Sequence, residues 1–166
     1  WACSTAGLWA QEIVLSVLPG HVGLGGVVRS GTFAALNVTI ENRSSQFREV
    51  HCDWLLDDVD GDSVHARRTV PLNPQRTERV WLYAIPPFNL AFWSKVDWKI
   101  QVIDAKTGKL LANQPVFPNE KLSPEDRVIA IVGGGLGVGL RPFGPDFTQH
   151  ERCRFITGLT PSTLPD

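Results

Sequence analysis

Apolar and polar residues alternate with a period of two from Gln11 to Phe117, a pattern typical of β-strands with one buried face. In Thr32–Glu41, for example, Ala34, Leu36, Val38 and Ile40 are expected to face inward and Phe33, Ala35, Asn37 and Thr39 outward. Turn pairs such as Pro19-Gly20 and Asp60-Gly61 separate the alternating segments. The pattern predicts about seven strands, within 12–18, 32–41, 47–57, 63–72, 79–85, 96–102 and 110–117.

No segment shows a helical stripe, and strands separated by regular turn signals indicate an all-β antiparallel sandwich. Cys52 alternates on the same face as Trp54, so it is expected in the core as a small hydrophobe. In the segment 63–72, Val64, Ala66, Arg68 and Val70 fall in one set, opposite His65, Arg67 and Thr69. The predicted core contains Leu36, Val38, Ile40, Trp54, Leu82, Trp98, Ile100 and Val102.

The C-terminal segment Arg127–Leu140 (RVIAIVGGGLGVGL) has a different pattern. A continuous apolar run followed by glycines is typical of the first buried strand of a parallel α/β sheet. Val128–Val132 and Arg154–Ile156 are expected to be neighbouring parallel strands. The expected organisation is a leader at 1–10, a sandwich at 11–118, an exposed polar linker at 119–126 and the truncated start of an α/β domain at 127–166.

The first ten residues, WACSTAGLWA, are small and apolar and carry no charge. They match the end of a secretory signal peptide with Ala10 placed for cleavage, although a disordered leader or a weakly paired strand is the alternative. An exported chain is therefore expected, in the periplasm or at the cell surface. The chain contains no run of about 18 apolar residues, so no membrane span is expected in this segment.

Several motifs resemble the Ig-like N-terminal domains of large exported bacterial proteins. VVRSGTFAALNVTIEN (27–42) is similar to that family's strand after a basic-Gly step, and DVDGDSVHARRTVPLNPQRTERVWLYAIPP (58–87) to its Asp-Gly-Asp hairpin and following strand pair. VIAIVGG (128–134) and FITGLTPSTLPD (155–166) look like the first two strands of its next domain. The resemblance implies an Ig-like or fibronectin-III-like sandwich, continued by a class I glutamine amidotransferase-like α/β domain in a membrane-anchored envelope protein.

That resemblance carries no catalytic residue onto this chain, because no Cys-His-Glu set is present and Cys153 does not lie in a Gly-x-Cys-x-Gly elbow. The glycines after Val132 also fail the dinucleotide fingerprint, since Val138 and Leu140 stand where its last Gly is needed. The acidic run Asp57–Asp62 lacks the EF-hand spacing, which favours a solvated hairpin. The sequence therefore predicts a chain that is not an enzyme.

Charge and cysteine content exclude further classes of partner and ligand. The net charge of −1 provides no basic field for nucleic acid. No Cys or His pair has ligand spacing, so no metal site is expected, and no other cofactor is expected either. Outside the leader, Cys52 has only Cys153 as a possible partner, in the separate C-terminal segment, so no disulfide is expected. Two glycosylation sequons begin at Asn37 and Asn42, and Asn42, at a strand end, is the expected acceptor.

Aromatic residues around the fifth predicted strand form the candidate contact surface: Trp81, Tyr83, Phe88, Phe92 and Trp93. Trp81 and Tyr83 alternate against Val80 and Leu82, so they are expected on the outer face. Such a surface contacts another domain or stacks on a ligand such as a sugar; alternatively, Phe92 and Trp93 close the end of the sandwich. Two functions compete: a non-catalytic spacing or docking module, with the downstream α/β domain, envelope proteins or glycans as partners, and a carbohydrate- or ligand-binding sandwich.

Overall fold

The computed structural model describes residues 12–18, 20–57, 62–86, 98–132, 153–159 and 164. All regular structure in these residues is β, in four sheets, and no helix occurs among them. The strands are β1 (Ile13–Ser16), β2 (Val27–Arg29), β3 (Ala34–Asn42), β4 (Arg48–Asp57), β5 (Ser63–Leu72), β6 (Arg76–Ala84), β7 (Lys99–Asp104), β8 (Leu110–Pro115), β9 (Glu120–Leu122), β10 (Arg127–Val132) and β11 (Cys153–Leu159).

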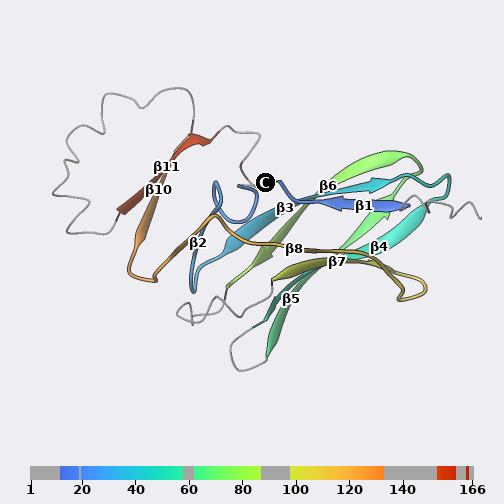
Figure 1. Ribbon diagram of the computed structural model, residues 1–166, viewed down its shortest axis with the longest axis horizontal. Coiled ribbons are helices and arrows are strands. Elements are labelled where there is room, and N and C mark those ends of the chain that lie inside the picture. The colour runs from blue at the N-terminus through green and yellow to red at the C-terminus, as the bar shows by residue number, and fades with distance from the viewer. Residues whose placement is uncertain are drawn as a thin grey trace, which may run out of the picture.

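Two antiparallel sheets share one hydrophobic core and are called here the two-sheet unit. One sheet has the order β1-β3-β6 and the other the order β5-β4-β7-β8, and Figure 1 shows their strands side by side. All seven strands expected from the alternation are present in it. β4 and β5 pair from Arg48↔Leu72 to Asp57↔Ser63, as a hairpin around Asp60-Gly61 requires, although residues 58–61 lie outside the described part.

The core of the two-sheet unit contains all eight residues of the predicted core, each at most 3% exposed: Leu36, Val38, Ile40, Trp54, Leu82, Trp98, Ile100 and Val102. Trp54 and Trp98 meet edge to face, with ring centroids 5.7 Å apart and planes at 79°. Cys52 is also fully buried, and burial raises the pKa of its thiol to about 12. The thiol is therefore a packed apolar group rather than a nucleophile.

Asn37 and Asp53 alternate onto outer faces, yet both are buried. Asn37 lies opposite Trp81 in the register, and its backbone N–H donates to the carbonyl of His21 at 3.0 Å, so it has chain on both sides within the sheet. Its Oδ1 is buried without a hydrogen-bond partner in the described structure. Asp53 accepts two hydrogen bonds from Arg67, at 2.7 and 2.6 Å, which place the guanidinium over it. Alternation identifies the face of a residue, and neighbours then decide its exposure.

On the inner face of β5, by contrast, some residues are more exposed than the alternation suggests. Arg68 and Val64 share the face of the buried Val70, but both are exposed, Val64 by 44%. The reason is that β5 is an edge strand of a four-stranded sheet that faces a three-stranded one, so part of its inner face has no strand opposite among the described residues. Arg68 reaches across this corner, and its Nη1 donates to the carbonyl of Trp81 at 3.4 Å.

Asn42 was the expected glycan acceptor, and that prediction is wrong for the folded chain. The residue is fully buried at the end of β3. Its Nδ2 donates to the carbonyls of Gln46, Leu72 and Asn73 at 2.9, 3.1 and 3.2 Å. The amide nitrogen that a glycan would occupy thus joins the β3–β4 and β5–β6 connections.

A second, smaller core joins the two-sheet unit to the C-terminal strands and is called here the junction cluster. It consists of Val27, Leu122, Ile156 and Leu159, with Leu24, Val128 and Leu164 packed against them. β2 pairs with β9, and β10 pairs with β11, both in parallel. The parallel pairing of β10 and β11 agrees with the sequence expectation. In Figure 1, β2 lies between this pair and β3.

Two strands of the junction cluster occupy segments expected to have no regular structure. β2 lies in the connection after Gly26, and β9 lies within 119–126, where an exposed linker was predicted. Gly25 has φ +59°, and a Cβ there would lie 2.6 Å from Cγ2 of Ile156. The Gly26 carbonyl accepts hydrogen bonds from the backbone N–H groups of Asn119 and Glu120 at 2.8 and 3.1 Å. Glycine therefore permits both the turn and the close approach of the C-terminal segments.

Candidate functional site

The predicted contact residues separate into two groups. Trp81 and Tyr83 lie on the outward set of β6, where Trp81 is half-buried and Tyr83 is 43% exposed. Phe88, Phe92 and Trp93 lie outside the described residues. The structure thus places two of the five predicted aromatic residues together on one face.

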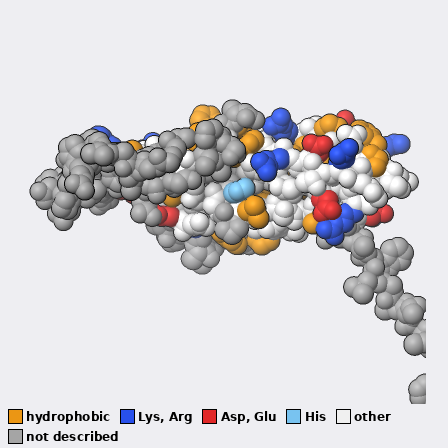
Figure 2. Space-filling model, turned by 90° about the horizontal axis from the view of Figure 1, so that it is seen from above, with side chains coloured by type: hydrophobic (Ala, Val, Ile, Leu, Met, Phe, Trp, Pro, Cys, Tyr) orange, Lys and Arg blue, Asp and Glu red, His pale blue; other side chains and the backbone are white. Residues whose placement is uncertain are grey.

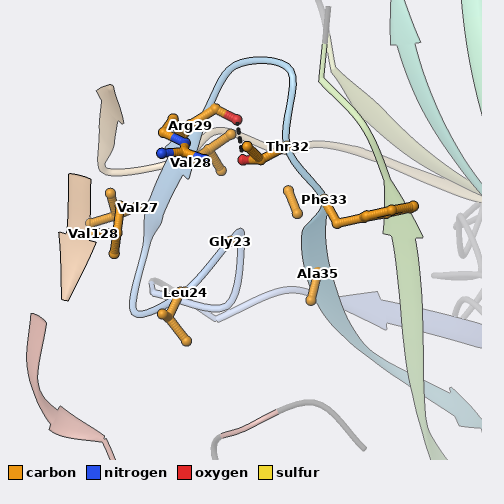
Figure 3. Close-up of a pocket in the computed structure, with 10 residues that line it drawn as sticks. Gly23, Leu24, Val27, Val28, Arg29, Thr32, Phe33, Ala35 and Val128 are labelled. Atoms are coloured by element: carbon orange, nitrogen blue, oxygen red, sulfur yellow. Dashed lines mark hydrogen bonds between the residues drawn. The ribbon is translucent and has the colours of Figure 1, made fainter. Parts of the chain in front are cut away.

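Two further apolar residues extend that face. Phe33 is 78% exposed and Ile85 is 44% exposed. The register pairs Ala35 with Tyr83 and Ala34 with Ala84, which brings Phe33 beside Ile85 at the end of β3. In Figure 3 the ring of Phe33 points away from the neighbouring cavity and toward β6, drawn in green. We call this set, Phe33, Trp81, Tyr83 and Ile85, the outer strip. Alternation already put Phe33 outward, but only the pairing of β3 with β6 shows that it adjoins Tyr83.

A cavity of about 340 Å³, called here the junction cavity, opens next to the outer strip. Its walls come from the connection before β2, from β2 itself, from the start of β3 and from Val128 of β10. In Figure 3, Val27 and Val128 lie on one side of it and Ala35 on the other, with Gly23 and Leu24 between. Nine of its ten lining residues lie between Gly23 and Ala35, and Val128 joins them because β10 packs against the junction cluster, a contact that periodicity could not predict.

Arg29 is the one charged residue among those that line the junction cavity in the described structure. Its Nη1 donates to the backbone carbonyl of Asp126 at 3.0 Å, which links β2 to the turn before β10. The hydroxyl of Thr32 donates to the carbonyl of Arg29 at 3.0 Å and fixes the backbone at the edge of the cavity (Figure 3). The cavity therefore combines aliphatic side chains with polar surface that includes one cationic group.

Elsewhere, charges of opposite sign pair or alternate. On the face seen in Figure 2, basic and acidic side chains are interspersed over the described part of the surface. Arg48 bridges Glu12 and Asp104, the latter at 3.6 Å. Hydrogen bonds from the backbone and hydroxyl of Thr107 lower the pKa of Asp104, and those from Lys106 and the charge of Arg48 act in the same direction. These pairs stabilise loops and create no region of a single sign on this face.

The described residues contain no group of three or more His, Cys, Asp or Glu side chains that could hold a metal ion. Among the described residues, one histidine contacts a hydroxyl: His51 Nδ1 lies 3.1 Å from Thr69 Oγ1. This pair is exposed on the outer face of the four-stranded sheet. In the part of the chain that the structure describes, no helix has the length and hydrophobicity needed to cross a bilayer.

No protein-family model and no curated protein sequence matches the chain. Among solved structures, Bacteroides uniformis β-glucuronidase 2 has a TM-score of 0.43 at 13% identity, over 63% of this chain and 12% of that one. Pseudomonas fluorescens alkylpurine DNA glycosylase AlkC has a TM-score of 0.40 at 13% identity, over 67% of this chain and 31% of that one. Listeria innocua β-glucosidase has a TM-score of 0.40 at 16% identity, with 67% and 16% coverage. Similarity at this level assigns neither a fold family nor an activity.

Proposed function

We propose that the chain is a non-catalytic, Ig-like or fibronectin-III-like module of an exported or membrane-anchored bacterial envelope protein, and that it docks a following α/β domain. The observation that carries this proposal is the junction cluster, in which Val27 of β2 packs with Leu122 of β9 and Ile156 of β11. The module thus holds the C-terminal strands through a buried apolar contact.

The strand arrangement supports the Ig-like part of the proposal. Three antiparallel strands share a core with four, and the chain passes between the sheets from β3 to β4, from β5 to β6 and from β6 to β7. Seven strands in two antiparallel sheets are characteristic of Ig-like and fibronectin type III domains. The core lies between the sheets, with Trp54 of one sheet buried together with Leu36 of the other.

The parallel pairing of β10 with β11 supports an α/β continuation. Parallel neighbours require a crossover connection of about a dozen residues or more, most often a helix. Residues 133–152 lie between the two strands and provide that length, outside the described part of the chain. The apolar leader WACSTAGLWA supports export, and fractionation of cells that express the native gene tests this part of the proposal.

Limited trypsin digestion of the full chain tests the docking. Pairing of β9 with β2 should protect the bond after Lys121, and pairing of β10 with β11 the bond after Arg127. Val27→Asp places a charge in the junction cluster and should accelerate cleavage there strongly, while the melting temperature of the two-sheet unit stays close to that of the parent. Val64→Asp, at an exposed position of β5, is the matched control. Equally fast cleavage at Lys121 in the parent and in Val27→Asp would contradict docking.

The outer strip favours a second function, ligand binding on an aromatic platform. Phe33 and Tyr83 are exposed side by side with the half-buried Trp81, and sugars stack on such surfaces. Tyr83→Ala should abolish retention on immobilised glycans if this function is correct. Equal retention of the parent and of Tyr83→Ala would exclude stacking on this residue.

A further inference from the structure

The junction cavity has the size and location of a small-molecule binding site, which docking of the C-terminal strands does not require. Its volume of about 340 Å³ lies within the range of small-molecule pockets, about 300–1,000 Å³. It lies between two packed units, a preferred location of such pockets. β2 separates the two cores, because Val28 belongs to the core of the two-sheet unit and Val27 to the junction cluster.

The walls of the cavity are mainly aliphatic. Leu24, Val27 and Val128 come from the junction cluster, and Ala35 faces them from β3 (Figure 3). Ala35 is only partly buried, and its small side chain leaves space where a longer residue would fill the cavity. Such a surface gains free energy by covering an apolar group, roughly in proportion to the area buried.

Arg29 gives the cavity its polar specificity. A guanidinium has five N–H donors, and the structure gives Arg29 one side-chain hydrogen bond, to the carbonyl of Asp126. Each ion pair found among the described residues involves another arginine, so Arg29 has no carboxylate partner within that part of the chain. A half-buried guanidinium without a counter-anion is suited to a planar carboxylate, which it binds with two parallel hydrogen bonds.

We propose that the junction cavity binds a small aliphatic carboxylate, with its carboxylate on Arg29 and its alkyl chain against Leu24, Val27 and Val128. The inference rests on the proposed docking, because Val128 belongs to β10. Binding would bridge β2 and β10, so occupancy would also strengthen the attachment of the C-terminal strands to the two-sheet unit.

Titration of the ¹⁵N-labelled full chain with hexanoate tests the proposal by NMR. Saturable shifts are expected at the amides of Gly23, Leu24, Arg29 and Val128. Because hydrogen bonds to charged groups contribute about 1.5–3 kcal/mol net, hexanoate should bind about tenfold or more tightly than 1-hexanol. The absence of saturable shifts at these amides, or equal affinity for 1-hexanol and hexanoate, would overturn the proposal.

Variants separate the two parts of the site. Arg29→Gln should remove the preference for hexanoate over 1-hexanol, and Arg29→Lys should restore part of it. Ala35→Leu should abolish binding of both probes by filling the cavity, whereas Thr39→Leu, at another partly buried outer position of β3, should bind both like the parent. Undiminished hexanoate binding by Ala35→Leu would place the ligand elsewhere and overturn the proposal.

The same spectra distinguish a failure of this proposal from a failure of docking. If docking is correct, the free chain shows nuclear Overhauser effects between the methyl groups of Val27 and Val128. Their presence without a response to hexanoate overturns the carboxylate site alone. Their absence in the free chain overturns both the docking and the cavity that depends on it.

Discussion

The two hydrophobic cores of this chain are built in different ways. The core of the two-sheet unit collects side chains from long, alternating strands, and many of them are completely buried, as Leu36, Trp54 and Ile100 are. The junction cluster depends on two strands of three residues, β2 and β9, and on glycines that allow close approach. Its four buried members remain 6–8% exposed. A large core follows from periodicity, whereas a docking contact follows from a few specific residues.

Removal of the largest core side chain should have the largest effect. Trp54→Ala deletes a fully buried indole that packs edge-on against Trp98, and it should lower the free energy of unfolding by about 3–5 kcal/mol. Urea denaturation followed by circular dichroism measures the change, with Val64→Ala, at a position 44% exposed, as the control. If Trp54→Ala unfolds at the same urea concentration as the parent, Trp54 does not anchor this core.

A polar residue also contributes to the two-sheet unit. Asn42→Ala would leave the carbonyls of Gln46, Leu72 and Asn73 without their side-chain donor, and it should cost about 1–3 kcal/mol. Thermal unfolding of Asn42→Ala beside Arg43→Ala, an exposed neighbour, measures this cost. Equal stability of the two variants would mean that water replaces the amide without loss.

Two glycines with positive φ allow the junction cluster to be tested separately. At Gly25, φ is +59° and an added Cβ would lie 2.6 Å from Cγ2 of Ile156. At Gly108, φ is +71° but an added Cβ would have no atom within 4 Å. Both substitutions carry backbone strain of about 1–3 kcal/mol, but only Gly25→Ala should increase hydrogen exchange in β10 and β11. Increased exchange there in Gly108→Ala would show that the two cores are not separable.

The smallest expected effect is on the pH dependence of stability, through Asp104 at the end of β7. The pKa of Asp104 is lowered from its usual 3.8, mainly by hydrogen bonds from Thr107. The charged carboxylate therefore stabilises the folded chain above pH 3.8, and this contribution is lost as pH falls through the lowered value. Asp104→Asn should melt slightly below the parent at about pH 6, and the difference should disappear in stronger acid. A difference that persists at the lowest pH would exclude the charge as its cause.

The sequence predicts the two-sheet unit well because its strands are long enough to express a period of two. It does not predict β2 or β9, since three residues cannot establish a period and their pairing partners are far apart in the chain. Asn37 and Asp53 show a second limit, because both are buried although they alternate outward, Asp53 beneath the Arg67 guanidinium. In the candidate site, the alternation correctly placed Tyr83 on the outer face. It could not show that Arg29 contacts Asp126 or that Val128 completes the junction cavity, because these contacts join segments far apart in the sequence.

The arginines of the edge strand β5 affect how molecules of this chain associate in concentrated solution. A ten-residue strand with hydrogen bonds on one side only can recruit the same strand of another molecule and extend the sheet. Antiparallel self-pairing centred on Arg67 would place Arg67 opposite its own copy, and pairing centred on Arg68 would do the same for Arg68. Like charges in direct opposition are unfavourable. Pro71 also removes one N–H donor from the strand. The two arginines are therefore expected to disfavour dimerisation through this edge of the described structure.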